Sequence, residues 1–157
     1  MKIVLLAVGK TDDSRISALV QMYVERLKHY VNFELCLLPD LKNTKNMSED
    51  RQKQEEGKNI LGLLQKSDFV TLLDERGKKM SSPHFAELIN KRSVSGLKRL
   101  VFVIGGPYGF SKDVYDRANS KLALSDMTFS HQMVRLFAVE QIYRAFTILK
   151  NEPYHHF

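Results

Sequence analysis

Three segments of the sequence follow apolar runs and carry residues that could bind a ligand. Gly105–Gly109 follows the run 100–104, Asp74 follows a pair of leucines, and a mixed segment spans 124–129. Glycines after a strand permit positive φ angles and let a ligand approach the backbone closely. In an open parallel sheet, ligands bind beyond the carboxyl ends of the strands. The segments together predict a small-molecule site, although a lone Gly-Gly-Pro is more typical of an ordinary tight turn.

Several other kinds of chemistry lack their motifs in this chain. The glycine segment does not fit G-x-G-x-x-G, and no G-K-[ST] phosphate loop occurs, which disfavours a dinucleotide or triphosphate site. The 5 histidines do not pair with cysteines at zinc-finger spacing, so we expect no metal. No G-x-S-x-G elbow or H-E-x-x-H helix is present.

Alternating strands and helices must position the three segments. Short apolar runs predict strands, and apolar residues at helical spacing predict the helices between them. The expected strands are 3–8, 33–38, 69–73 and 100–104, and the expected helices start near Ser14, Met47, Ser82, Ser111 and Gln132. Segment 74–78 is expected to be a polar turn, and segment 122–129 is expected to be a short strand followed by a loop. The charged segment 40–58, which includes Glu56, is expected to be a solvated loop that leads into the exposed face of a helix. The pattern predicts one α/β domain over 1–157, with a mostly parallel sheet flanked by helices.

Composition limits the class of protein and its partners. The chain has 157 residues and a net charge of 24 − 18 = +6, which fits either a polyanion partner or a harmless excess. Its single cysteine, Cys36, excludes a disulfide scaffold and is expected to be a buried small hydrophobe. The opening apolar run is too short for a signal peptide, and no run approaches the ~20 apolar residues of a membrane helix. We therefore expect a cytoplasmic protein with no membrane partner.

Four ordered segments of the carboxyl half resemble one bacterial family. They are 102–109, 122–135, 140–145 and 153–155, and the opening 2–10 also matches. The chain is similar, over nearly its whole length, to the ribosomal RNA large subunit methyltransferase H family, whose members methylate N3 of a pseudouridine in 23S ribosomal RNA. The resemblance implies a SPOUT fold with a deep trefoil knot within about 69–157. It also implies a homodimer and S-adenosylmethionine as cofactor.

The resemblance assigns cofactor-binding residues to the same three segments that sheet geometry selects. Leu73, or its neighbour Leu72, is expected to contact the cofactor after the third strand. Gly105 is expected to contact it after the fourth strand. The loop expected to wrap the cofactor consists of Leu124, Ser125, Asp126, Met127, Thr128 and Phe129. Backbone groups there can bind adenine edges, and apolar side chains can enclose the ring. Leu73 and Met127 could also be plain core residues.

The implied reaction moves a methyl group from a sulfonium to a ring nitrogen that must first lose its proton. A positioned base and a stabilised anion are therefore needed. Within the matching motifs, we expect Arg135 to bind a substrate anion or phosphate. We expect Tyr154 and His155 to position the base or transfer its proton. His131 is a further candidate, and its alternative role is to cap the last helix. The alternative role of Arg135 is to form an ion pair with Glu140.

Two other functions remain open from the sequence. One is a noncatalytic RNA- or ribosome-binding factor, which would not need an intact cofactor segment. The other is a small-molecule enzyme, which the absence of phosphate-binding motifs and the +6 charge both disfavour. No separate RNA-binding module is visible. If the chain is the methyltransferase, we predict that it recognises the assembled ribosome and needs both protomers.

Overall fold

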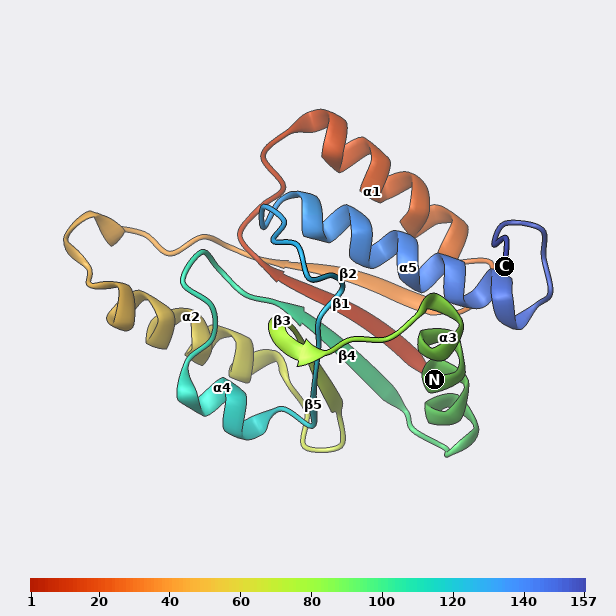
Figure 1. The fold of residues 1–157 in the computed structure, drawn as a ribbon. Coiled ribbons are helices and arrows are strands. Elements are labelled where there is room, and N and C mark those ends of the chain that lie inside the picture. The colour runs from red at the N-terminus through yellow and green to blue at the C-terminus, as the bar shows by residue number, and fades with distance from the viewer.

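The computed structural model describes residues 1–157, in which five strands form one parallel sheet (Figure 1). The sheet order is β2-β1-β4-β3-β5, and every neighbouring pair is parallel. The strands are β1 (Lys2–Val8), β2 (Asn32–Leu38), β3 (Phe69–Lys78), β4 (Arg99–Ile104) and β5 (Ser120–Leu122). The predicted α/β fold with a parallel sheet is confirmed. The knot expected within 69–157 stays a prediction.

Helices cover both faces of this sheet. The helices are α1 (Ser14–Leu27), α2 (Glu49–Leu63), α3 (Ser82–Val94), α4 (Lys112–Arg117) and α5 (Met133–Leu149), with a short 3-10 turn, η1, at Thr44–Asn46. Alternate residues of β1 explain the layers, because Ile3 and Leu5 pack with α1, α3 and α5, whereas Val4 and Leu6 pack with α2 and α4. None of the helices is long and apolar enough to cross a membrane.

Most helices begin at the residues that the sequence suggests. The side chains of four N-cap residues accept a backbone N–H from the first turn: Asp13, Ser48, Ser81 and Ser111. The last helix differs, because Gln132 at its N-cap position makes no capping bond. Gln132 instead reaches back, accepting the backbone N–H of Asp12 at 2.8 Å and donating to the carbonyl of Lys10 at 3.2 Å. The start of α5 is thus fixed by the loop after β1.

Two expectations about the middle of the chain are wrong. Segment 74–78 is not a turn but the second half of β3, whose Lys78 pairs with Leu122 after an irregularity in the ladder. Glu56 does not lie on an exposed helix face, since only 5% of it is accessible. The polar residues of both segments suggested exposure to solvent, but contacts with residues distant in sequence determine the structure of each segment.

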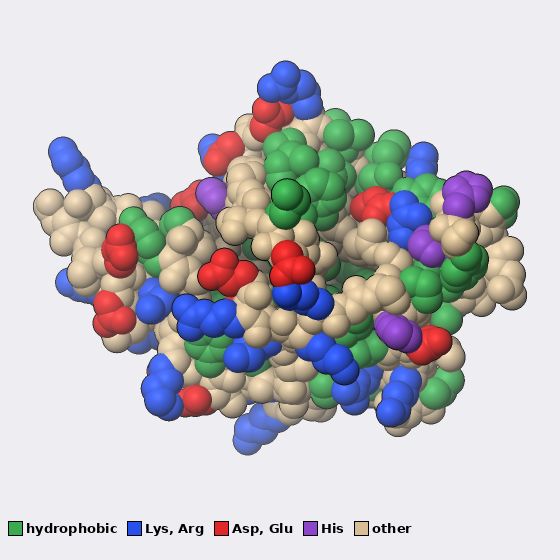
Figure 2. All heavy atoms as spheres, viewed as in Figure 1, with side chains coloured by type: hydrophobic (Ala, Val, Ile, Leu, Met, Phe, Trp, Pro, Cys, Tyr) green, Lys and Arg blue, Asp and Glu red, His purple; other side chains and the backbone are tan.

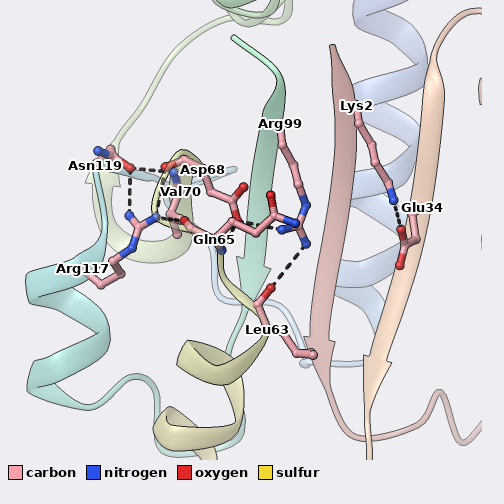
Figure 3. A network of polar contacts seen from close by, with 9 residues as sticks. All are labelled: Lys2, Glu34, Leu63, Gln65, Asp68, Val70, Arg99, Arg117 and Asn119. Atoms are coloured by element: carbon pink, nitrogen blue, oxygen red, sulfur yellow. Dashed lines mark hydrogen bonds and ion pairs between the residues drawn. The ribbon is translucent and has the colours of Figure 1, made fainter.

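Side chains tie the amino-terminal end of the sheet together (Figure 3). The carboxylate of Asp68 accepts hydrogen bonds from Arg99 at 2.9 Å and from the backbone N–H of Gln65 at 2.8 Å. Arg117 donates to the carbonyl of Gln65 at 2.7 Å, and Asn119 accepts the N–H of Val70 at 2.8 Å. These bonds join the beginnings of β3, β4 and β5, and they leave the opposite end of the sheet available for a site.

Candidate functional site

A pocket of about 640 Å³ opens at the carboxyl ends of β3, β4 and β5. Residues 73–76 of β3, the glycine turn after β4 (Gly105–Gly109) and the segment after β5 form its wall, and 11 of the 23 lining residues are hydrophobic. This volume lies within the usual range for small-molecule sites. The mixed lining suits a ligand that combines an apolar ring with polar groups.

Most of the residues predicted to hold a cofactor line this pocket. They are Leu73, Gly105, Leu124, Ser125, Met127, Thr128 and Phe129. The neighbouring Leu72 is fully buried in the core on the other face of the sheet, so it is Leu73 that reaches the pocket. Asp126 does not line it: its side chain is 78% exposed and forms an ion pair with Lys79. The structure therefore brings together seven of these eight residues.

The glycine turn brings bare backbone to the pocket wall. Gly109 has a φ angle of +80°, which favours glycine, and its N–H donates to the carbonyl of Gly106 at 3.1 Å. A Cβ on Gly105 would lie 3.0 Å from the ring of Phe110. A Cβ on Gly106 would collide with the carboxylate of Glu56. Gly105 and Gly106 are thus packed closely by neighbouring side chains, whereas Gly109 is favoured by its positive φ angle.

Charged groups of both signs face the pocket. Asp74 accepts hydrogen bonds from the hydroxyl of Tyr115 and from the backbone N–H of Arg76, the latter at 2.8 Å. Burial, together with this bond to Asp74, raises the pKa of Tyr115 to about 12, so the phenol stays a hydrogen-bond donor at neutral pH. Lys53 and Arg76 also line the pocket. Asp74 could thus face a cationic part of a ligand, and the two basic residues an anionic one.

The structure does not place Arg135 in the pocket. Only 1% of the residue is accessible, and its guanidinium donates to the carbonyls of Val8 at 2.7 Å, Gly9 at 2.8 Å and His131 at 3.1 Å. Burial lowers its pKa from the usual arginine value. The alternative ion pair with Glu140 is wrong, because Glu140 pairs with Arg144 at 2.7 Å, and substrate binding by Arg135 stays a prediction. Arg135 therefore joins the end of β1 to the start of α5, with its donors directed at backbone carbonyls and at the hydroxyl of Thr11.

Tyr154 and His155 also lie outside the pocket of their own chain. The tail folds back on α5, where the hydroxyl of Tyr154 donates to Glu140 at 2.9 Å and lies 3.2 Å from that of Tyr23. A ring nitrogen of His155 lies 3.2 Å from the guanidinium of Arg144. Burial and these bonds raise the pKa of Tyr154. Figure 1 shows the carboxyl terminus at the end of α5 that is remote from Met133.

His131 is the histidine that the structure brings to the pocket. It is not the N-cap of α5, since Gln132 holds that position, so the alternative role as a helix cap is wrong. The sequence already offered His131 as a candidate. That His131 and not His155 lines the pocket depends on where α5 begins relative to β4. No group of three or more His, Cys, Asp or Glu side chains is arranged to hold a metal.

Comparison with known proteins places the chain in a family. A family model described as "Predicted SPOUT methyltransferase" matches residues 1–155. A protein of Christiangramia forsetii named ribosomal RNA large subunit methyltransferase H is 63% identical over 156 residues, covering 99% of both chains. Relatives with the same name from Flavobacterium johnsoniae and Porphyromonas gingivalis are 56% and 51% identical, again over 99% of both chains.

Solved structures share the fold at much lower identity. The tRNA (m1G37) methyltransferase of Aquifex aeolicus has a TM-score of 0.58 and 17% identity, with 100% of this chain and 76% of that chain covered. At this identity the likeness supports the fold alone. Together with the full-length relatives and the matching family model, it leads to one assignment. The chain belongs to the SPOUT methyltransferase family, among the proteins named ribosomal RNA large subunit methyltransferase H.

Proposed function

We propose that this protein transfers a methyl group from S-adenosylmethionine to N3 of a pseudouridine in 23S ribosomal RNA. The observation that carries the proposal is the pocket, built from the three segments that the family resemblance assigns to the cofactor. Near-identical length and more than half of all residues in common link the chain to relatives named for ribosomal RNA methylation. We also propose that residues 1–157 act as one SPOUT domain, since all five strands join a single sheet.

The residues of the pocket fit S-adenosylmethionine. Leu73, Leu124 and Phe129 offer apolar surface to an adenine ring, and the glycine turn offers backbone groups to its polar parts. Asp74 offers a carboxylate to a sulfonium or an ammonium group. The cofactor, when bound, supplies an electrophilic methyl group. A pure RNA-binding factor would have no use for such a cradle, which favours the enzyme over that alternative.

We assign the proton acceptor to His131, because it lines the pocket whereas His155 and Tyr154 do not. An imidazole nitrogen can accept the imide proton as N3 forms its bond to the methyl carbon. Bound S-adenosylmethionine would supply the methyl group and would keep the electron pair of the methyl–sulfur bond. His131 would then hold the imide proton, with the positive charge on its imidazolium.

A His131→Gln variant is expected to lower kcat about 100-fold, the usual contribution of a general base. Its affinity for S-adenosylmethionine should stay within about threefold, because glutamine keeps a polar side chain at the pocket rim. Single-turnover methylation of ribosomes measures the first quantity and calorimetry the second. His84→Gln, at an exposed position on α3, is the matched control and should behave as wild type. Wild-type turnover by His131→Gln would remove the assignment.

Ribosomal RNA is the partner that the charge distribution favours. Figure 2 shows Lys and Arg side chains gathered across the lower half of the face that carries the pocket segments. Such groups bind phosphates through counterion release, so binding should weaken steeply with added salt. The full-length relatives named for ribosomal RNA methylation support the proposal that the protein acts on the assembled ribosome in the cytoplasm.

We propose a homodimer held through α1 and α5. Leu19 and Met22 of α1 and Phe137 of α5 are large hydrophobic residues that remain 45%, 37% and 38% exposed in one chain. In Figure 2 hydrophobic side chains gather over these helices, next to the start of α5 and therefore next to His131. A second copy covering this face would bury its apolar surface at the edge of the pocket.

Leu19→Glu is accordingly expected to yield a monomer that no longer methylates ribosomes, because it places a charge inside the proposed interface. Light scattering after size-exclusion chromatography reads the oligomeric state. Val94→Glu, which changes an even more exposed apolar residue on α3, is the control and should stay dimeric. A dimeric Leu19→Glu protein would mean that the interface lies elsewhere.

Calorimetric titration with S-adenosylmethionine tests the function itself, using the wild type and Gly105→Leu. The wild type should bind saturably, and the variant should lose binding because leucine must displace Phe110 or enter the pocket. Gly62→Leu is the matched control, since nothing lies within 4 Å of a Cβ at that position. Absence of wild-type binding, both alone and with ribosomes present, would favour the noncatalytic RNA-binding factor.

A further inference from the structure

Glu56 is a buried acid on α2 that the proposed chemistry does not use. Only 5% of the residue is accessible, and it does not line the pocket. Its carboxyl group lies instead behind the glycine turn, where its carbon would be 2.8 Å from a Cβ on Gly106. Gly106 itself faces the pocket. The carboxyl group and the proposed ligand thus lie on opposite sides of the same stretch of backbone.

The hydrogen bonding of this carboxyl group is incomplete. Oε1 accepts a bond from the amide of Gln52 at 3.0 Å, whereas Oε2 is buried and no protein group bonds to it. Burial raises the pKa of Glu56, and the negative charge of the nearby Asp40 raises it further, whereas the hydrogen bond from Gln52 lowers it. Buried polar atoms nearly always have a partner, because an unpaired one destabilises the fold. A native side chain that leaves one oxygen free suggests a second arrangement in which that oxygen is used.

The next residue of α2 shows that the helix is shaped to this turn. A Cβ on Gly57 would collide with the hydroxyl of Ser111 and lie 3.3 Å from Val114. Ser111 caps α4 immediately after the glycine turn. Consecutive residues of α2 therefore contact the two ends of the segment 106–111, Glu56 through its carboxyl group and Gly57 through its lack of a side chain.

We propose that Glu56 is a positioning residue for methyl-donor binding: its free oxygen bonds to the backbone of the glycine turn when the donor occupies the pocket. The inference rests on the proposed function and extends it to a residue outside the pocket. Binding of a ligand to the exposed side of the turn orients its peptide groups, and a polar group behind the turn stabilises that orientation. The donor and Glu56 then act on the same few peptide groups from opposite sides.

Two variants separate this role from simple packing. Glu56→Gln keeps the shape and the donor and acceptor groups of a protonated carboxyl group, and Glu56→Leu keeps the approximate volume but cannot form the bond. Calorimetry with S-adenosylmethionine and thermal unfolding are measured for each. Glu55→Gln, which alters the neighbouring, partly exposed acid on the same helix, is the control and should match the wild type.

We expect Glu56→Leu to weaken donor binding about 10- to 100-fold, the effect of losing one buried hydrogen bond. Its melting temperature should stay near that of the wild type, because leucine also removes an unpaired buried oxygen. Glu56→Gln should bind within about threefold of the wild type. Wild-type affinity in the leucine variant would overturn the proposal, as would an equal loss in both variants, which would indicate packing alone.

The glutamine variant keeps the proposal testable even if Glu56→Leu fails to fold. The raised pKa means that the folded protein holds the Glu56 proton more tightly than the unfolded chain. Stability is therefore lost as pH rises from the unfolded pKa to the folded pKa, and donor binding should change over the same range. Glu56→Gln should flatten the pH dependence of donor affinity, whereas an unchanged profile would overturn the proposal. A wild type that binds no donor at all would instead count against the proposed function.

Discussion

A Gly77→Ala protein should unfold more easily than the wild type by about 3 kcal/mol and should lose methyl-donor binding. The added Cβ would lie 2.5 Å from the backbone carbonyl carbon and nitrogen of Leu122 and 2.7 Å from the nitrogen of Ala123. Backbone atoms cannot rotate away as a flexible side chain could. The clash therefore has to separate β3 from β5, where Ala123 donates to the carbonyl of Lys78 at 3.1 Å.

The effect on binding follows from the same contact. Leu122 and Ala123 line the pocket and lead into the segment proposed to wrap the cofactor. Denaturant unfolding and donor titration measure the two losses. Gly62→Ala is the matched control, since a Cβ at that helical position meets nothing within 4 Å. It should stabilise the protein by about 0.5–1 kcal/mol. If Gly77→Ala were as stable as the wild type, β3 and β5 would have to pack less closely than described.

Arg135→Met should lower the free energy of unfolding by about 3 kcal/mol, because each buried acceptor left without its donor costs about 1–3 kcal/mol. The substitution leaves the carbonyls of Val8 and Gly9 and the hydroxyl of Thr11 without their donor. It also releases the first turn of α5 from β1, because the carbonyl of His131 loses the same partner.

Urea unfolding measures this loss, with Arg51→Met as the exposed control that should change stability by no more than about 0.5 kcal/mol. The result also decides between two roles for Arg135. A residue that bound a substrate phosphate would leave stability intact and weaken only RNA binding, with a smaller salt dependence. Loss of a structural residue would instead lower stability and leave the salt dependence of RNA binding unchanged. It should also displace His131 and thereby lower turnover.

The fold could be read from local signals because those signals match the final contacts. The run 100–104 became the central strand β4, and hydroxyl or carboxylate residues cap four of the helices where expected. Segment 74–78 was different, because its polar residues belong to a strand only through pairing with Leu122, more than forty positions later. No local pattern contains that pairing.

The site was only partly predictable for the same reason. Strand ends in a parallel sheet meet by geometry, so the three segments that line the pocket could be chosen before their contacts were known. The burial of Arg135 depends on carbonyls 126 and 127 positions away. The burial of Glu56 depends on the glycine turn 50 residues later, so a charged run looked like a solvated surface.

The anchors of the segment 123–132 have a thermodynamic consequence. This stretch has no regular secondary structure, yet Ala123 bonds to Lys78 at one end and Gln132 bonds to Lys10 and Asp12 at the other. A loop fixed at both ends samples few shapes before its ligand arrives, so binding removes little conformational entropy from it. Affinity for the methyl donor should then depend on Gln132, a residue that does not line the pocket and acts by limiting the shapes that the empty loop can adopt.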